Sequence, residues 1–501
     1  MANRRLKSIV GIFVAHWFIV VTLAMVLTYA LTMLIGMKQS IWFDESYSII
    51  LAKRPVDELL ALTAVDAHPP FYYLYLKVWA SVFGWSEFAL RSSSAILGAA
   101  GVGIAAAIIR KMFSTRVALA TLPFVMLAPF LLRYDFEIRM YAMASLIGLA
   151  ATWVLLRASE SNQKRWWYGY AALVALGMYT LYMTVVIWFA HVIWLAIVKY
   201  RQTKSFRSVL WQPAVLSYVG AVALFAPYLP TFVSQMQLSA LPPGMGSVMT
   251  SEKFIGIFSE LFSYRPDWLA DVVLRLVLFA VLLLAGFIGL RVFKQAKQKD
   301  KKYIALLLSL AIVPIVFYAI ISYALAPIFV FRYMAHVAIY IYILVGLLIV
   351  LGWKKVRRAA VILGVIVAVL LVEGTVYLYR EGNYNLERTQ YPMGYHVRQA
   401  IECNDDTIVI TDDLYTYIDM QYYFEDCDLR FRNPEDPRNV GGYAVLRGND
   451  KRITSIDEIS APKVVHIYQN DIPRTLHPES KYTLIKTLTF DKNTIGIYEK
   501  S

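Results

Sequence analysis

The sequence has 501 residues, of which 58% are hydrophobic and only 17% are charged. Soluble globular chains carry about 25% charged residues, so this composition excludes an ordinary soluble enzyme and predicts a membrane protein. The formal net charge of +14 does not indicate nucleic-acid binding, because the basic residues lie in short loops between apolar segments, where the positive-inside rule places them.

Apolar segments long enough to cross a bilayer as helices recur through the first three quarters of the chain. We expect about eleven spans. They lie near 10–36, 88–109, 117–132, 138–156, 167–182, 184–198, 209–227, 269–290, 303–325, 334–352 and 359–379. No signal-peptide cleavage site follows the first, so we expect it to remain as a helix. The sequence therefore predicts a multi-pass α-helical membrane domain over 1–379.

Basic residues set the expected orientation. Six segments that flank the spans hold 23 of the 49 lysine and arginine residues, and such segments remain on the cytoplasmic side. We therefore expect a cytoplasmic N-terminus in the plasma membrane. With an odd number of spans, the loops and the tail that alternate with these segments lie outside. The expected outer segments are 37–87, 133–137, 228–268, 326–333 and 380–501.

Two adjacent acids stand in the first outer loop, 37–87, directly after the first span. They are Asp44 and Glu45 in the stretch FDES. A carboxylate beside hydrocarbon is costly and usually marks a functional site. The alternative is that both acids lie in the first turn of a helix over SYSIIL and stabilise its N-terminus.

The same loop predicts a juxtamembrane helix over FYYLYLKVW. It follows His68, Pro69 and Pro70, and the prolines favour an extended entry followed by a first helical turn. This helix is apolar almost all round except for Lys77, so we expect it to lie along the membrane surface. Lys77 either meets a ligand or extends its ammonium to the interface.

Charged residues also gather at two later outer turns. The stretch RYDFEIRMYA, 133–142, holds Asp135, Glu137, Arg139 and Tyr141, and FVFRYMAH, 329–336, holds Arg332 followed by Tyr333. An arginine within an apolar helix requires a partner, so Arg139 is either part of a site or pairs with a carboxylate such as Glu137. Arg332 either belongs to the same site or anchors lipid headgroups.

The tail, 380–501, is polar and reads as a small α/β domain. Strands are expected at 407–412, 463–469 and 483–490, with a helix over LYTYIDMQYYFED between the first two. Cys403 and Cys427 are the only cysteines. In an oxidising compartment they form a disulfide, and otherwise they are two buried thiols.

Together, these outer cations suit a phosphate, the acids suit a proton acceptor, and the interleaved aromatics suit sugar rings and prenyl chains. The order of the motifs resembles the GT-C superfamily of membrane glycosyltransferases, and most closely its family 39-like bacterial enzymes. APFLLRYDFEIRMYAM, 128–143, is similar to that family's P-F-x-x-x-Y-x-x-E-x-R-x-Y-A signature, and MYTLY, 178–182, to its Y-T-H-Y element. Leu181 stands where that element has His, and Asp135–Phe136 stands where a small polar residue and Gln are common. The second acid of the site is therefore either Asp135 or Glu137.

The resemblance implies a GT-C fold and an inverting hexosyl or pentosyl transfer from a polyprenyl-phosphate sugar to an extracytoplasmic protein, glycan or lipid. Asp44 would act as the base and Glu45 would position it. Lys77, Arg139 and Arg332 would bind the donor phosphate. His68, Asp135, Glu137, Tyr141 and Tyr333 would shape the site. A divalent cation, Mg²⁺ or Mn²⁺, is an option at Asp44, Glu45 and Glu137.

A polytopic transporter or flippase without transferase activity is the alternative, because it too would combine many helices with buried charges. The charges of this chain cluster at the outer face, whereas transporter sites lie near the midplane. No inverted repeat is visible in the sequence either. The sequence therefore favours the transferase.

Overall fold

The computed structural model describes residues 11–161, 163–210, 213–237, 248–263, 271–324, 329–381, 393–432, 441–446, 451–469, 474, 476–490 and 493–500. The chain divides into two compact units. The first comprises 1–35, 91–232 and 241–380, and the second comprises 36–90, 233–240 and 381–501. The first outer loop thus groups with the tail, whereas the sequence suggested a simple division at residue 379.

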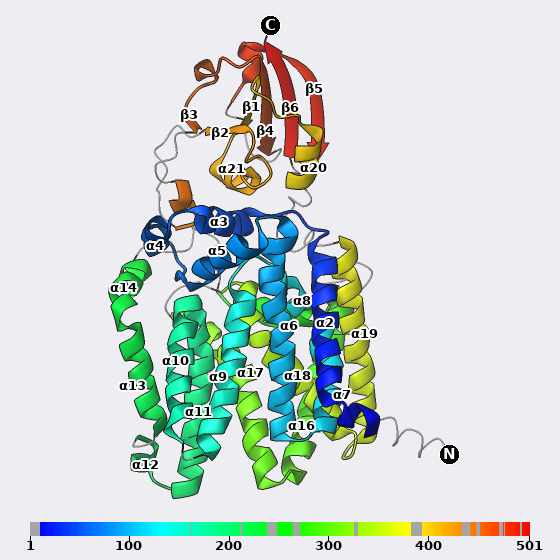
Figure 1. Cartoon of the computed structure of the whole chain (residues 1–501). Coiled ribbons are helices and arrows are strands. Elements are labelled where there is room, and N and C mark those ends of the chain that lie inside the picture. The colour runs from blue at the N-terminus through cyan, green and yellow to red at the C-terminus, as the bar shows by residue number, and fades with distance from the viewer. Residues whose placement is uncertain are drawn as a thin grey trace. The chain divides into compact units, whose positions relative to one another are not determined.

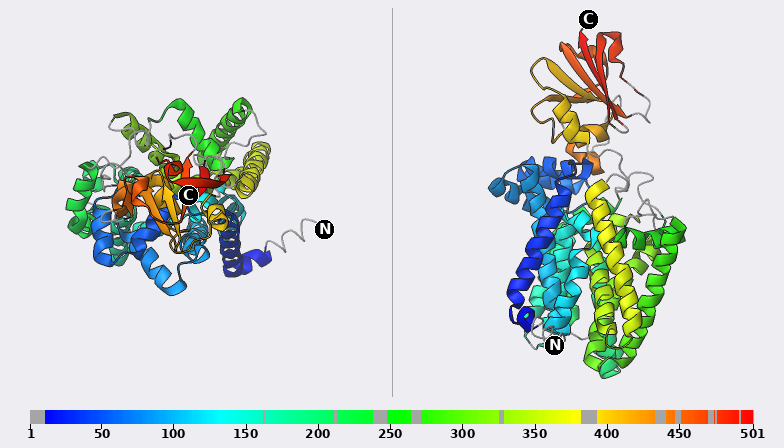
Figure 2. Two further views of the ribbon diagram at one scale, coloured as in Figure 1. Left: turned by 90° about the horizontal axis from the view of Figure 1, so that it is seen from above. Right: turned by 90° about the vertical axis from the view of Figure 1, so that its right-hand side faces the viewer.

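The first unit is a bundle of long helices that run side by side (Figures 1 and 2). Its long members are α2 (Trp17–Gly36), α6 (Glu87–Met112), α7 (Thr115–Met126), α9 (Tyr141–Glu160), α10 (Lys164–Thr180), α11 (Val185–Thr203), α13 (Pro213–Phe225), α16 (Asp271–Gln295), α17 (Gln298–Ala324), α18 (Ala335–Gly352) and α19 (Arg357–Glu381). The shorter helices are α8 (Pro129–Asp135), α12 (Phe206–Leu210), α14 (Leu229–Gln237) and α15 (Ser251–Phe262), with 3-10 turns η1 (Tyr182–Thr184), η2 (Ala226–Tyr228) and η3 (Phe331–Met334).

Nine helices among the described residues are long and apolar enough to cross a membrane, or ten if α7 and α8 form one bent span. We expected eleven spans. The span that is missing from the larger count of ten is α10, which corresponds to the expected span 167–182. This helix has 17 residues and begins with the polar sequence KRWW. At 1.5 Å per residue it is about 25 Å long, at the lower limit for a hydrocarbon core of about 30 Å. It packs against α9 and α13 inside the bundle.

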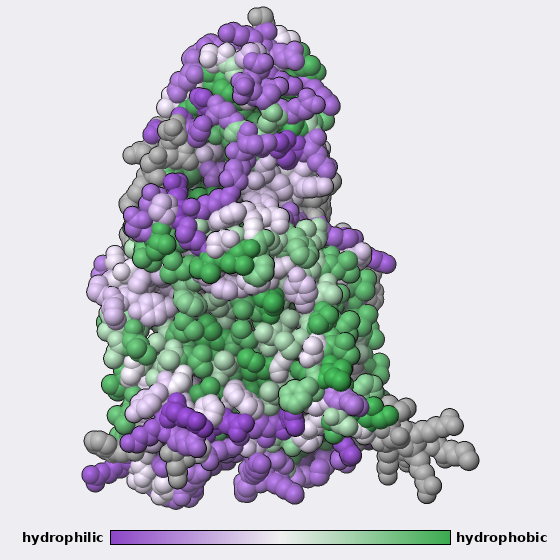
Figure 3. Space-filling model, viewed as in Figure 1, coloured by the Kyte–Doolittle hydropathy of each residue, from purple (hydrophilic) through white to green (hydrophobic). Residues whose placement is uncertain are grey.

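The basic loops gather at one end of this bundle. Lys111 at the end of α6 pairs with Glu160 at the end of α9 (Nζ–Oε2 2.6 Å). Glu160 also accepts a hydrogen bond from the Tyr303 hydroxyl at the start of α17 (2.6 Å). Figure 3 shows the resulting pattern on one face, a hydrophobic band over the spans with a hydrophilic rim along its lower edge. The basic segments that the sequence places on one side of the membrane therefore lie at one end of the bundle.

A bend at the opposite end of the bundle carries the RYDFEIRMYA stretch. Helices α7 and α8 meet at 68°. Ala128 between them is extended (φ −77°, ψ 104°), because Pro129 disfavours a helical conformation in the preceding residue and begins α8 at its first turn. Leu132 and Phe136 then join a buried cluster with Ile35 of α2 and Leu378 of α19. The short helix is thereby fixed against two spans.

The second unit joins the first outer loop to the tail. The loop forms α3 (Phe43–Lys53), α4 (Val56–Ala64) and α5 (Phe71–Phe83). The tail begins with α20 (Met393–Ala400) and builds a six-stranded sheet in the order β3-β2-β1-β4-β6-β5. The strands are β1 (Thr407–Thr411), β2 (Asp428–Arg432), β3 (Arg452–Ile453), β4 (Lys463–Gln469), β5 (Tyr482–Phe490) and β6 (Asn493–Lys500), with α21 (Leu414–Met420) after β1. Three further 3-10 turns are η4 (Gly441–Leu446), η5 (Ile456–Glu458) and η6 (Pro478–Ser480).

The sheet is mixed. Strand β1 pairs in parallel with β2 and β4, with Val409 opposite Val465, whereas β6 is antiparallel to β4 and β5. The small α/β domain and its three expected strands are therefore confirmed. The expected helix is shorter than predicted, because α21 ends at Met420 and turns lead to Cys427. Cys427 forms a disulfide with Cys403, which resolves the choice that the sequence left open.

Candidate active site

The acidic pair lies in the first turn of α3, where both carboxylates are favourable to the helix dipole. The two side chains differ in access. Glu45 is fully buried, whereas Asp44 is only partly buried. A base must reach the proton that it accepts, so Asp44 is the better candidate of the two. The helix-terminus alternative is thus compatible with a chemical role for Asp44.

Lys77 on α5 has a structural contact within the second unit. Its Nζ donates to the carbonyl oxygens of Ala52 (3.2 Å) and Arg54 (2.8 Å) at the end of α3. The last carbonyls of a helix have no partner inside the helix, so the ammonium stabilises this end. The expected phosphate-binding role of Lys77 remains a prediction. It has less support than the same role for Arg332, because the Lys77 ammonium already has two carbonyl partners.

His68 stands at the entry to α5 and faces Asp66. Its Nδ1 lies 3.4 Å from Asp66 Oδ2, and the Asp66 side chain is 4% exposed. This acid at the turn before the prolines therefore orients the imidazole. The expected site-shaping role of His68 stays a prediction.

At the bend of the first unit, Glu137 pairs with Arg133, Oε1 to Nη2, at 2.7 Å. Both side chains are almost fully buried. The guanidinium of Arg133 also lies 5.2 Å from the ring centroids of Tyr134 and Phe136. Arg139 is buried as well, and its backbone N–H donates to the Glu137 carbonyl at 2.6 Å. From the sequence we considered a Glu137–Arg139 pair and did not name Arg133 as a site residue. Arg133 lies four residues before Glu137, and this spacing is the one that brings two side chains together on a helix.

Aromatic rings extend this cluster towards Arg332. Tyr134 packs edge-on against Tyr141, with ring centroids 5.3 Å apart. The Tyr134 hydroxyl interacts electrostatically with Arg133, Glu137 and Arg332, so it brings the late arginine together with the ion pair. We call Arg133, Tyr134, Glu137, Tyr141 and Arg332 the bend cluster.

Tyr333, the neighbour of Arg332 in η3, is held from α17. Its carbonyl accepts a hydrogen bond from the Tyr318 hydroxyl (3.0 Å), and the two rings stack at 6.4 Å. The turn that carries Arg332 is therefore held by α17 through Tyr333.

Asp135 lies elsewhere. A Cβ at Gly98 on α6 would come within 2.3 Å of Asp135 Cγ, so the carboxyl occupies the space that a side chain at Gly98 would fill. Its neighbours there include Thr28, Ser145 and Ile339. Asp135 thus packs among α2, α6, α9 and α18, whereas Glu137 belongs to the bend cluster. This difference favours Glu137 as the second acid.

The metal option at Asp44, Glu45 and Glu137 finds no support. In the part of the chain that the structure describes, no three His, Cys, Asp or Glu side chains come together as a metal site would require. We therefore route no step through a metal ion.

The second unit also contains a cavity of about 490 Å³ beside α3. One wall carries Ser46 and Lys53 of α3, and the other carries Tyr422, Glu425 and Lys451 of the tail. Both hydrogen-bonding and apolar groups line it. Its volume lies in the range of small-molecule sites, about 300–1,000 Å³.

Comparisons with known proteins show which family model and which solved structures this chain resembles. The family model of dolichyl-phosphate-mannose-protein mannosyltransferases matches residues 67–230. No curated protein matches the sequence. Among solved structures, the chain is similar to ArnT from Cupriavidus metallidurans bound to undecaprenyl phosphate, with a TM-score of 0.60 and 12% identity over 97% of this chain and 98% of that one. The apo state of the same ArnT gives a TM-score of 0.61 and 12% identity over 96% and 98%.

The oligosaccharyltransferase AglB from Archaeoglobus fulgidus, in complex with an inhibitory peptide and a dolichol-phosphate, is a more distant match. Its TM-score is 0.51 with 13% identity, over 91% of this chain and 70% of that one. The chain therefore shares the fold of these solved structures, which agrees with the architecture that the motifs predicted. The similarity to ArnT extends over nearly the whole length of both chains, tail included.

Proposed function

We propose that this protein transfers a sugar from a polyprenyl-phosphate donor to an acceptor on the outer side of the membrane. The bend cluster carries the proposal. It holds a buried guanidinium–carboxylate pair and a second arginine, Arg332, whose charge acts on the same Tyr134 hydroxyl as that pair. The fold supports it, because the similar ArnT structure is bound to undecaprenyl phosphate.

The roles follow from the charges that develop during transfer. The acceptor hydroxyl loses a proton as its oxygen attacks the anomeric carbon, and Asp44 accepts that proton. The bond between the anomeric carbon and the phosphate oxygen breaks, and the electron pair leaves with the lipid phosphate. Arg332 stabilises this leaving phosphate with parallel hydrogen bonds from its planar guanidinium. Arg133 and Glu137 hold the surrounding polar groups in place.

The cavity beside α3 is a candidate place for the acceptor. Ser46 of α3 lines it, whereas Asp44, two residues earlier, projects from another side of the same helix. The Ser46 hydroxyl is buried and has no hydrogen-bond partner among the described residues. A hydroxyl-rich or peptide acceptor would supply one.

The test is transfer by purified protein in proteoliposomes. Undecaprenyl-phosphate-linked hexoses and pentoses would be supplied one at a time, and release of undecaprenyl phosphate and of free or transferred sugar would be followed by mass spectrometry. We expect turnover with at least one donor and none with nucleotide sugars. If no donor is consumed while labelled lipid crosses the bilayer, the transporter alternative replaces this proposal.

A further inference from the structure

Three tyrosines of the tail contact Ile41 and Phe43, just before the acidic pair Asp44–Glu45. The ring of Phe43 stacks on that of Tyr415, with centroids 4.5 Å apart and planes 8° from parallel. It meets the edge of Tyr443 at 5.8 Å. Two residues earlier, the Ile41 backbone N–H donates to the Tyr423 hydroxyl at 2.8 Å. We call Tyr415, Tyr423 and Tyr443 the tyrosine clamp.

The clamp encloses Phe43 closely. The Phe43 side chain is buried, and a Cβ at Gly442 would lie only 3.3 Å from its ring. Residue 43 is also the first residue of α3, so its ring sets where the helix begins. Because Asp44 is the next residue, any movement of Phe43 in the clamp moves the carboxylate with it.

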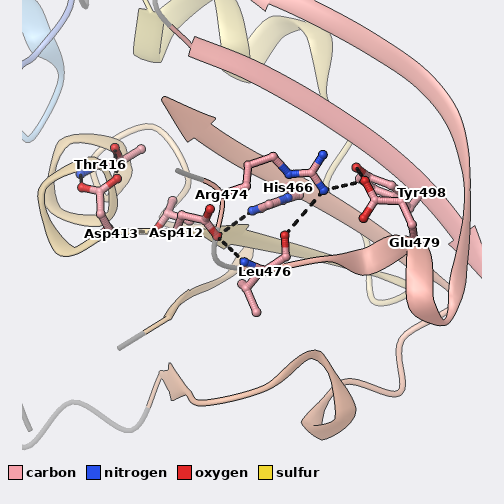
Figure 4. Close-up of polar contacts among 9 residues, drawn as sticks. Asp412, Asp413, Thr416, His466, Arg474, Leu476, Glu479 and Tyr498 are labelled. Carbon is pink, nitrogen blue, oxygen red and sulfur yellow. Dashed lines mark hydrogen bonds and ion pairs between the residues drawn. The ribbon is translucent and has the colours of Figure 1, made fainter. Parts of the chain in front are cut away.

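Partly buried hydrogen bonds fix the turn at the end of β1, next to Tyr415 in the sequence (Figure 4). Asp413 caps α21, accepting from the Thr416 backbone N–H and from its hydroxyl, each at 2.8 Å. Asp412, one residue earlier, pairs with His466 of β4 at 2.8 Å and accepts from the Leu476 backbone N–H at 3.3 Å. The turn that presents Tyr415 is thereby fixed to the central strands of the sheet.

The other end of α3 is attached by a different kind of contact. Lys53 forms an ion pair with Glu425, whose side chain is 65% exposed. Such exposed pairs contribute little to stability. The clamp, by contrast, holds the buried ring of Phe43, and it acts at the end of the helix that carries Asp44.

We propose that the tyrosine clamp positions Asp44, so that the tail is a working part of the active site and Tyr415 is a positioning residue. The inference rests on the proposed function, because it takes Asp44 as the base. A displacement of about 1 Å in a reacting group can lower a rate by about 100-fold. The stack of Phe43 on Tyr415 is the clamp contact that single substitutions can remove from either side, and this makes the inference testable.

The central test compares Tyr415→Ala with Tyr415→Phe. The contact is ring on ring, so the phenylalanine variant keeps it and should retain kcat within about twofold. The alanine variant should lose about 10- to 100-fold in kcat with the donor KM within about twofold, since Tyr415 is not proposed to contact the donor. Asp457→Asn is the control in the tail, because it removes an exposed ion pair with Lys481 that does not line the cavity, and it should behave as the parent.

A double-mutant cycle separates positioning from general damage to the tail. Phe43→Leu removes the stack from the α3 side and leaves the tail sequence intact, so it tests the inference even if Tyr415→Ala misfolds. The double variant Phe43→Leu/Tyr415→Ala should be no slower than the slower single variant. Hydrogen exchange of the peptide 40–53 should rise in both single variants and stay unchanged in Asp457→Asn.

The outcomes distinguish the two proposals. Turnover by the parent together with parental kcat in Tyr415→Ala and in Phe43→Leu overturns the clamp and leaves the transferase intact. Losses that multiply in the double variant also overturn it, because the two residues would then act separately. A parent that consumes no donor overturns the proposed function, and this inference with it.

Discussion

Arg133 and Glu137 form an ion pair that is almost completely withdrawn from solvent. Nη2 and Oε1 are 2.7 Å apart, and the two side chains are only 7% and 1% exposed. Desolvating two charges costs several kcal/mol per ion, which their attraction often fails to recover. An apolar pair of similar size would serve stability as well. The retention of the charges therefore favours a role in the site.

Replacing one partner should differ sharply from replacing both. Glu137→Leu leaves the buried Arg133 guanidinium without its carboxylate, and it should cost about 3–5 kcal/mol of unfolding free energy. The double variant Arg133→Met/Glu137→Leu should recover most of that loss in thermal unfolding, because neither charge of the pair is then left buried without the other. We expect it to remain inactive in transfer. A double variant as active as the parent would show that the pair is structural only.

Asp44→Asn should abolish most of the transfer while binding of undecaprenyl phosphate persists. The substitution keeps the shape and removes the proton acceptor, and a positioned base contributes about 10²–10⁴-fold. Asp57→Asn is the matched control, because Asp57 is also an aspartate in a first helical turn, but is exposed on α4. Turnover would be compared at saturating donor. Equal rates in both variants would move the assignment to Glu45 or Glu137.

A cysteine at Ser480 should report the side of the tail. Ser480 is exposed in η6, and the native cysteines are joined in a disulfide. An odd number of crossings from a cytoplasmic N-terminus makes Ser480→Cys reactive to an impermeant maleimide in intact cells. Ser205→Cys, beside Lys204 and Arg207, should react only after lysis. Labelling of Ser480→Cys only after lysis would require an even number of crossings, as if α10 did not cross.

Local patterns predicted the elements of this fold well. Long apolar runs predicted the spans, because a helix that crosses the hydrocarbon core must be apolar over about 20 residues. Short runs rich in β-branched residues predicted three strands of the tail. The bend at Pro129 needed tertiary context, since a proline permits a kink without setting its angle. The Phe43–Tyr415 stack joins residues from opposite ends of the chain, so no local pattern could reveal it. The motif was enough to propose Glu137 as a site residue. It could not show that Asp135 lies apart from Glu137, because the Asp135 carboxyl fills the space beside Gly98 on α6, and that depends on how the helices pack.

The Cys403–Cys427 disulfide should stabilise the tail. It closes a loop with a sequence separation of 24 residues, for which loss of chain entropy in the unfolded state contributes about 3 kcal/mol. The variant Cys403→Ser/Cys427→Ser should therefore be cleaved faster by protease within 393–432 than the oxidised parent. The parent treated with reductant should match the variant. Equal cleavage of the variant and the oxidised parent would show that the bond adds nothing to the tail.

The variant Arg332→Lys should show whether Arg332 binds the donor phosphate or only anchors the protein to lipid headgroups. Arg332 is half-buried in η3 and lies near the Tyr134 hydroxyl of the bend cluster. A point charge suffices at a membrane interface, so lysine would replace an anchoring arginine with little change. A phosphate held by parallel hydrogen bonds needs the planar guanidinium, and hydrogen bonds to charged groups contribute about 1.5–3 kcal/mol. We therefore expect kcat/KM for the donor to fall about 10- to 100-fold, with thermal unfolding unchanged. Arg207→Lys, at the exposed start of α12, is the control for a surface arginine. Parental kinetics in Arg332→Lys would leave Arg332 as an anchor and return the phosphate to Arg139 or Lys77.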